Sequence, residues 1–178
     1  MQPSSSQALP HLVRLKDGTE VLIRKAEPED FRILYLMFNS FSAETMFRRF
    51  LMSNTRLEAG DVQEMLRLED TNVTSLIAVL HSDGKEQAVG EARYVTDSAG
   101  RVAEAAVVIA DHLQNRGLGT VLFSDLIAEG RKQGLKTMFA YFDVDNKAII
   151  RVGQKVGFKL APVEGRPDYS MIKAEIGL

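Results

Sequence analysis

Apolar and polar residues alternate along several short segments of this chain and recur every three or four positions along others. Alternation is typical of β-strands with one buried face, and the longer spacing is typical of amphipathic helices. We expect the first two strands to pair across Asp17-Gly18 and the third to fifth to form an antiparallel meander. The strands predicted from alternation and flanking turn residues are Leu12–Leu15, Glu20–Lys25, Asn72–His81, Gln87–Thr96, Arg101–Ala110, Lys136–Phe142, Phe158–Val163 and Tyr169–Glu175.

Helical spacing predicts helices interleaved with these strands. A helix over Phe31–Phe38 follows Pro28, and a short one begins after Ser42, whose hydroxyl suits an N-cap. Further helices are predicted over Leu57–Leu68, from Gly117 to Gly134, and over Asn146–Val156. In the helix after Gly117, the side chains expected to face solvent are Ser124, Asp125, Glu129 and Lys132.

Length and composition favour one domain. The chain has 178 residues, of which 45% are apolar, enough for a hydrophobic core. Residues 1–10 are rich in Ser, Gln and Pro, and we expect a flexible tail there, with residues 11–178 forming the domain. Mostly antiparallel strands with interleaved helices make the expected fold class α+β.

Charge and cysteine content exclude several functions. The formal net charge is −2, whereas a general nucleic-acid binder normally has a basic excess. The absence of cysteine removes disulfides, thiolate nucleophiles and acyl-cysteine intermediates. No apolar run approaches the ~20 residues of a membrane helix and no secretory signal is visible, so we expect a cytoplasmic protein without a membrane partner. No metal site is predicted, because metal-ligand spacing is absent among His11, His81 and His112.

The most informative segment is a glycine-containing turn between a buried strand and a helix, Gln114-Asn115-Arg116-Gly117-Leu118-Gly119-Thr120. A helix N-terminus presents free backbone N–H groups and the positive end of the helix dipole, which favour an anion. Gly117 and Gly119 would let that anion approach the backbone closely, and Arg116 would add a charged hydrogen bond. The segment therefore predicts a diphosphate-binding turn.

Other interpretations of this turn fit less well. A dinucleotide-binding fold would place a third glycine near Leu122 and would surround the turn with parallel βαβ units. A mononucleotide P-loop needs Gly-Lys-Ser/Thr, which is missing. An ordinary strand–turn–helix connection, with glycines only for geometry, remains the alternative for the turn taken alone.

A second segment, Asn146–Phe158, narrows the choice of ligand. It begins about 30 residues after the turn and carries Asn146 at its start and Lys155-Val156-Gly157-Phe158 at its end. In combination with Gln114-x-x-Gly-x-Gly, it resembles the GNAT superfamily of N-acetyltransferases. The order of the predicted elements matches that family along Val21–Glu175.

The resemblance implies acetyl-CoA as co-substrate, bound where the parallel strands Arg101–Ala110 and Lys136–Phe142 splay apart, in a mostly antiparallel sheet with helices on both faces. The first of these strands would face the pantetheine and thioester. The turn amides would hold the pyrophosphate, and an asparagine side chain would reach the pantetheine or ordered water. The residues implied at the cofactor are Val107, Val108, Ile109, Gln114, Asn115, Arg116, Gly117, Leu118, Gly119, Thr120 and Asn146.

Acetyl transfer to an amine needs a base, because a lysine-like amine with a pKa of ~10.4 is almost fully protonated at neutral pH. Glu104 is our candidate, since it lies on an apolar strand in phase with Val108, where a carboxylate is costly unless it is paired or used. The alternative is a solvated strand end. Glu91 is the second candidate base, with a cross-strand ion pair to an arginine as its structural alternative. A backbone N–H near Val108 would polarise the thioester carbonyl.

The family's usual general acid is missing. Many GNAT members carry a tyrosine seven residues after the asparagine, and that position here is Gly153. The CoA thiolate would then leave unaided, or take its proton from water or from another group such as Tyr141.

Three segments also resemble the catalytic domain of bacterial Pat-type protein lysine acetyltransferases. In that group the glutamate matching Glu104 is the base, and the tyrosine acid is likewise absent. The match is partial, because Phe47 stands where another aromatic residue, usually tyrosine, is expected. The three segments are Ser42–Phe50, Val89–Val95 and Ala103–Ala106.

The resemblance predicts direct transfer from acetyl-CoA to a primary amine in a ternary complex, with a protein lysine preferred as the acceptor. A small-molecule amine acetyltransferase and a non-catalytic acyl-CoA-binding sensor stay open, as does a homodimer. The first helices and the Gly165–Asp168 loop would form the acceptor site. Arg48 and Arg49 would face an acidic substrate, the CoA phosphates or solvent. The basic stripe of the second segment would lie at plain surface or near the 3′-phosphate; its members are Lys147, Arg151 and Lys155.

Overall fold

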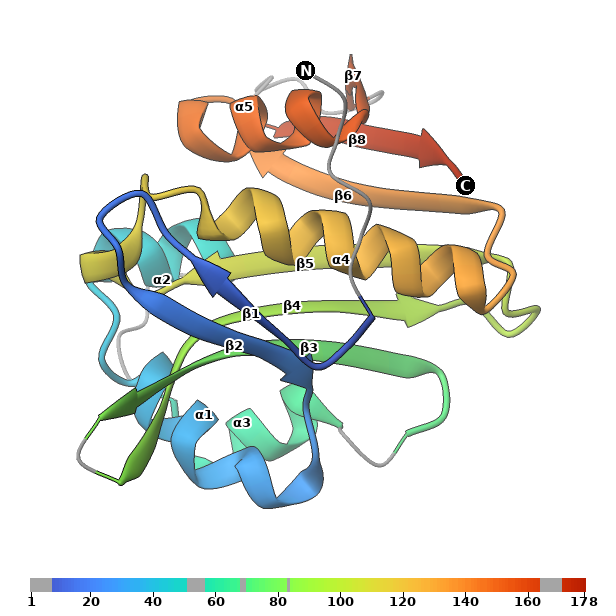
Figure 1. The fold of residues 1–178 in the computed structure, drawn as a ribbon. Coiled ribbons are helices and arrows are strands. Elements are labelled where there is room, and N and C mark those ends of the chain that lie inside the picture. The colour runs from blue at the N-terminus through green and yellow to red at the C-terminus, as the bar shows by residue number, and fades with distance from the viewer. Residues whose placement is uncertain (1–7, 51–56, 68–69, 83, 164–170) are drawn as a thin grey trace.

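The computed structural model describes residues 8–50, 57–67, 70–82, 84–163 and 171–178. In these ranges the strands form one sheet in the order β1-β2-β3-β4-β5-β6-β8-β7 (Figure 1). The strands are β1 (His11–Arg14), β2 (Glu20–Lys25), β3 (Val73–Ser82), β4 (Lys85–Thr96), β5 (Val102–Ile109), β6 (Thr137–Asp143), β7 (Lys159–Pro162) and β8 (Met171–Gly177). The helices are α1 (Phe31–Phe38), α2 (Ala43–Phe50), α3 (Ala59–Leu66), α4 (Leu118–Lys132) and α5 (Lys147–Val156), with 3₁₀ turns at Pro28–Asp30 and Asp111–Leu113.

The strand pairing confirms the predicted α+β class. Strands β1 and β2 form the expected hairpin, and β3, β4 and β5 form the expected antiparallel meander. Strands β5 and β6 pair in parallel, whereas β6 with β8 and β7 with β8 are antiparallel. The predicted 1–10 tail up to residue 7, the 165–168 loop and the start of the last predicted strand lie outside the described residues.

Helices cover both faces of the sheet (Figure 1). On one face, α4 packs its apolar side chains, among them Leu122 and Leu126, against the meander. On the other face, Leu34 and Phe38 of α1 and Val62 of α3 form a second apolar cluster with β3, β4 and β5. Each such fully buried side chain contributes on the order of 1.5–3 kcal/mol to folding. In the ranges that the structure describes, no helix combines the length and apolarity needed to cross a bilayer.

The outer side of α4 differs from the expectation. Asp125 and Glu129, expected to face solvent, are each only 5% exposed. The N-terminal hairpin covers this side of the helix: His11 Nε2 lies 2.9 Å from an Asp125 oxygen, and Lys25 Nζ lies 3.0 Å from a Glu129 oxygen. The prediction was wrong because helical periodicity identifies the side that packs on the sheet, but not a second layer from a distant segment.

Candidate functional site

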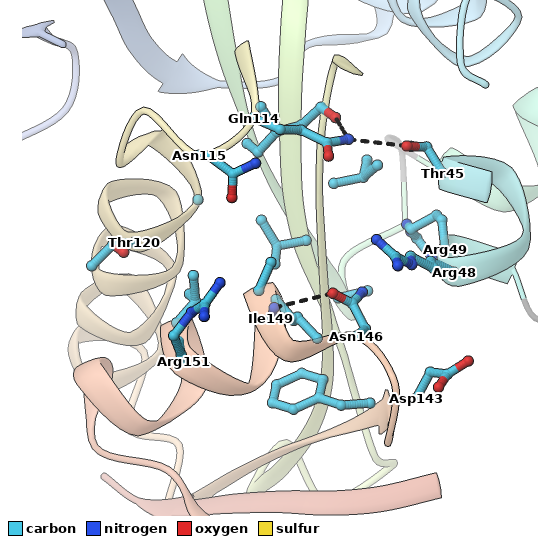
Figure 2. A pocket seen from close by; sticks show the side chains of 18 of the residues that line it. Thr45, Arg48, Arg49, Gln114, Asn115, Thr120, Asp143, Asn146, Ile149 and Arg151 are labelled. Atoms are coloured by element: carbon cyan, nitrogen blue, oxygen red, sulfur yellow. Dashed lines mark hydrogen bonds between the residues drawn. The ribbon is translucent and has the colours of Figure 1, made fainter. Parts of the chain in front are cut away.

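A cleft opens where β5 and β6 separate. Their parallel pairing covers only Val102–Glu104 with Thr137–Phe139. Both strands continue beyond this point, each held by its outer neighbour, β5 by β4 and β6 by β8. The cleft has a volume of about 480 Å³ and is lined by residues of both strands and of α2, α4 and α5 (Figure 2). The predicted splay of two neighbouring parallel strands is therefore confirmed.

Most of the residues expected at the cofactor line this cleft; the exceptions are the side chains of Arg116 and Leu118. Arg116 forms an ion pair with Asp17 in the β1–β2 turn. Leu118 is 1% exposed, because it opens the apolar face of α4. The residues that do line the cleft are Val107, Val108, Ile109, Gln114, Asn115, Gly117, Gly119, Thr120 and Asn146.

The turn before α4 has the geometry of an anion site. Gly117 is the N-cap of α4 with φ +97°, a conformation that L side chains rarely adopt, and Asn115 also has a positive φ of 61°. Apart from Thr120, whose N–H donates to the Gly117 carbonyl at 3.1 Å, the first N–H groups of the helix have no earlier helical carbonyl to bond. A Cβ on Gly119 would lie 3.7 Å from Ile109 Cγ1 and 3.9 Å from Val152 Cγ2, two residues that line the cleft. A side chain at Gly119 would therefore occupy space beside these amides.

Polar side chains after β5 anchor α2 beside the cleft. Gln114 Nε2 donates hydrogen bonds to Thr45 Oγ1 at 3.0 Å and to the Ile109 carbonyl at 3.1 Å (Figure 2). Asp111 accepts hydrogen bonds from the Ser42 backbone N–H, the Ser42 hydroxyl and the Thr45 hydroxyl at 2.6–2.8 Å. Burial favours protonation of Asp111, but these hydrogen bonds outweigh it and hold the pKa of that carboxyl below its usual value. The side chain of Gln114, the first residue of the predicted turn, thus holds α2 in place at the wall of the cleft.

Asn146 begins α5 at the cleft. Its Oδ1 accepts a hydrogen bond from the Ile149 backbone N–H at 3.2 Å, so it acts as the N-cap (Figure 2). The basic stripe of this helix divides. Arg151 and Lys155 line the cleft, whereas Lys147 is outside the lining and donates from its Nζ to the Val144 carbonyl at 2.6 Å.

Packing explains the glycine at the position of the family's tyrosine. A Cβ on Gly153 would lie 2.7 Å from Phe142 Cε2 and 3.3 Å from its Cζ. The Phe142 ring belongs to an aromatic cluster with Phe123 and Phe158. A tyrosine at this position would displace that ring. Tyr141, the other candidate acid, is 45% exposed and lines the cleft.

Glu104 lies just before the cleft. It pairs with Val95 and Phe139, ends the parallel ladder and is exposed, while Ala105 is the first β5 residue in the lining. The surroundings are therefore those of the alternative, a solvated position: Glu104 has strand partners on both sides, but its face of the sheet is exposed at this point. Val108 lies further along the same face, about 13 Å away at ~3.3 Å per residue.

Glu91 is fully buried on β4, directly opposite Val108 of β5. Ser75 Oγ donates a hydrogen bond to Glu91 Oε1 at 3.0 Å. Its ion-pair partner is Arg49 of α2, at 3.6 Å, so the expected arginine comes from a helix instead of a neighbouring strand. Arg48 instead pairs with Glu44 at 2.5 Å near the surface, and both arginines line the cleft. Arg49 lies one helical turn after Thr45, so the two side chains share one face of α2, and Thr45 is buried. This spacing is the sequence signal that could have separated Arg49 from Arg48.

Comparisons with known proteins agree with this geometry. The family described as acetyltransferase (GNAT) domain matches residues 20–159. Acetyltransferase PA5475 of Pseudomonas aeruginosa is 30% identical over 144 residues, covering 81% of this chain and 77% of that protein. Acetyltransferase Pat of Mycolicibacterium smegmatis is 26% identical over 165 residues, covering 92% of this chain, which spans only 47% of Pat.

A solved structure shows the same fold. The GNAT domain of S. lividans PAT superposes with a TM-score of 0.82 over the full length of both chains, at 22% identity. The splayed strands and the glycine turn at the helix N-terminus agree with the family match. This chain belongs to the GNAT acetyltransferase family.

Proposed function

We propose that this protein is an N-acetyltransferase that moves the acetyl group of acetyl-CoA to a protein lysine by direct attack. The observation that carries the proposal is the cleft between β5 and β6, which ends at the N-terminus of α4. After Glu104, the edge of β5 that faces β6 has no strand partner among the described residues. Its backbone groups at Val107–Ile109 can bond the amides of a pantetheine chain as they would bond an added strand.

The N-terminus of α4 favours binding of the diphosphate at the other end of the pantetheine chain. The open amides after Gly117 and the helix dipole favour the pyrophosphate of CoA. Arg151 and Lys155 line the same cleft and add positive charge for phosphate oxygens. An extended acyl-CoA with its phosphates at α4 would present its thioester beside Val108.

The transfer step follows from this placement. The neutral amine nitrogen attacks the thioester carbonyl carbon and forms the C–N bond, while a backbone N–H near Val108 stabilises the oxyanion. The C–S bond then breaks, and the sulfur leaves with the bonding pair and takes a proton from water. Before the attack, Glu104 takes the proton of the ammonium form through ordered water, because the distance along β5 is too long for direct contact. The second proton passes from the attacking nitrogen to solvent as the intermediate collapses. The chain has no cysteine to carry an acyl-enzyme thioester.

The choice of a protein lysine rests on likeness to Pat. The helix α2 segment, the β4 segment and the Glu104 segment carry the resemblance to Pat-type enzymes, and the chain aligns with Pat over 165 residues. The open face of the sheet at Glu104 also leaves room for an acceptor to approach from the side opposite α4.

The test is CoA thiol release by the purified protein from acetyl-CoA, with lysine-containing proteins and peptides, free amino acids, polyamines and aminoglycosides as acceptors. Mass spectrometry identifies the acetylated product. We expect release with protein lysines. If only small amines give release, the acceptor is a small amine and not a protein lysine. If acetyl-CoA binds but no acceptor gives release, the protein is a sensor.

A further inference from the structure

One charged cluster of the cleft has no part in holding acetyl-CoA in the proposed function. Arg49 reaches from α2 toward Glu91 of β4, and its side chain is only 12% exposed while that of Glu91 is fully buried. In Figure 2 Arg49 stands across the cleft from Thr120 and Arg151 of the phosphate end. The cluster therefore lies on the opposite wall of the cleft from these two residues.

The sheet register places the cluster beside the reacting group. Glu91 is the cross-strand partner of Val108, and the two side chains share one face. Arg49 is anchored on Glu91 and also lines the cleft. If the thioester lies beside Val108, the guanidinium of Arg49 stands next to the acyl group and the incoming amine.

The guanidinium is incompletely satisfied. An arginine carries five N–H donors, and the Arg49–Glu91 separation of 3.6 Å exceeds hydrogen-bond length. Among the described residues, Arg49 Nε and Glu91 Oε2 are both buried without a hydrogen-bond partner. The Arg49 guanidinium also lies over the Phe50 ring, 5.0 Å from the ring centroid, a contact that leaves its Nε–H without an acceptor. A largely buried cation that is incompletely hydrogen-bonded favours an anion in the cleft that it lines.

The local charge also favours an anion. Arg93 follows Glu91 on the same face of β4 and is 7% exposed, so Glu91 lies among two largely buried arginines. Arg48, paired with Glu44 near the surface, is a second arginine in the cleft lining beside Arg49. An acetyl group and a lysine side chain carry no negative charge, so neither of them uses this cluster.

Building on the proposed transfer, we propose that Arg49 binds a carboxylate that one of the reactants carries close to the transferred acyl group. Glu91 acts as the positioning residue, holding the guanidinium toward the cleft through the ion pair. The carboxylate has two sources: an acidic residue beside the acceptor lysine, or the free end of a dicarboxylic acyl thioester such as succinyl-CoA.

The test compares kcat/KM for CoA thiol release in three reactions. The first has acetyl-CoA and a lysine peptide with neutral neighbours, the second replaces one neighbour by glutamate, and the third pairs succinyl-CoA with the neutral peptide. We expect either the second or the third reaction to exceed the first by about tenfold or more, the effect of one charge-assisted hydrogen bond. The faster reaction identifies the source of the carboxylate.

Variants then assign the preference to Arg49. Arg49→Gln should remove it while leaving KM for acetyl-CoA within about twofold. Glu91→Gln should weaken it in the same direction, through the arginine. Arg14→Gln removes an exposed arginine, 73% accessible and outside the cleft, and should keep the preference. If Arg49→Gln does not fold, Arg49→Lys, which keeps the charge but loses the planar fork, should show a reduced preference.

The outcomes separate this inference from the function on which it rests. A wild-type protein that releases CoA equally in all three reactions contradicts the inference, and that result needs no variant. A preference that survives in Arg49→Gln also contradicts it. If no reaction releases CoA, the proposed transfer itself fails, and the role of Arg49 falls with it.

Discussion

The two ends of the cleft are built in different ways. The phosphate end is built mainly by one continuous segment, Gln114–Thr120, whose backbone amides take their directions from Gly117 and the start of α4, with Arg151 and Lys155 of α5 also in the lining. The acyl end combines Arg49, Glu91 and Glu104, side chains from α2, β4 and β5. Local backbone conformation is enough to form the first end, whereas the second depends on how distant elements pack. We therefore expect changes at the phosphate end to alter affinity and changes at the acyl end to alter turnover.

The largest expected effect is at the acyl end. Glu104→Gln should lower kcat by ~10² or more, because it removes the base that neutralises the amine. The affinity for acetyl-CoA should change little, since Glu104 is outside the cleft lining. Stopped-flow or steady-state CoA release gives kcat, and calorimetry gives the dissociation constant.

The matched control for this substitution is Glu20→Gln. Glu20 is an exposed glutamate on β2 whose ion pair with Arg14 lies at the surface. Activity in this variant should equal that of the wild type. A Glu104→Gln protein with unchanged kcat would remove Glu104 from the role of base.

The anchor of α2 should give the next largest effect. Asp111→Ala removes the acceptor of three hydrogen bonds from Ser42 and Thr45 and leaves these donors partly unsatisfied. We expect the free energy of unfolding to fall by about 1–3 kcal/mol. Turnover of a carboxylate-bearing substrate should also fall, because α2 carries Arg49, while acetyl-CoA affinity should be kept. Chemical denaturation and CoA release measure the two effects, and a loss of affinity alone would contradict this division.

The same carboxyl predicts a pH dependence. The pKa of Asp111 is lowered in the folded protein because hydrogen bonds to Thr45 and Ser42 outweigh its burial. A lowered pKa gives stability that is present above the unfolded value of ~3.9 and is lost as pH falls through the folded value. Between about pH 5 and 3, wild-type stability should therefore decline more steeply than that of Asp111→Ala. Parallel curves would show that Asp111 does not contribute in this range.

At the phosphate end, Gly119→Ala should change affinity and stability in opposite directions. The new methyl would stand among cleft-lining groups without a clash, and alanine favours a helix over glycine by up to ~1 kcal/mol. The melting temperature should rise by about 2–4 °C. Acetyl-CoA should bind about tenfold more weakly, because the methyl occupies ligand space. Unchanged affinity would place the pyrophosphate elsewhere.

The smallest effect is expected for Arg116→Gln. The resemblance places Arg116 at the pyrophosphate, yet its guanidinium pairs with Asp17 near the surface. Such a pair contributes only ~0–1 kcal/mol. We expect acetyl-CoA affinity to change less than about threefold, as measured by calorimetry. A tenfold loss would show that Arg116 leaves Asp17 to bind a phosphate.

The contrast between the two ends also explains what the sequence could predict. Gln114–Thr120 and Asn146–Phe158 could be placed because a glycine turn and an N-cap are properties of neighbouring residues. The meander and the splayed strands followed from alternation and from family resemblance. Positions whose environment comes from a distant element were harder to predict. Asp125 is buried by the N-terminal hairpin, and the Phe142 ring lies against Gly153.

The surroundings of Glu104 and Arg49 could not be predicted from the sequence either: Glu104 is exposed and Arg49 is largely buried. Glu104 lies on an apolar strand and is exposed, because one strand's sequence does not show which part of its sheet face another layer covers. Arg49 was one of two adjacent arginines with no visible difference, and the packing of α2 turns it toward Glu91 while Arg48 pairs with Glu44. In both cases tertiary packing decides the surroundings of the side chain.

Direct transfer within a ternary complex is the central claim, and initial-rate kinetics with acetyl-CoA and a lysine peptide both varied test it most directly. We predict double-reciprocal lines that intersect, because both substrates must occupy the cleft before the C–N bond forms. Parallel lines would contradict the account, since they would require an acyl-enzyme that releases CoA before the amine binds.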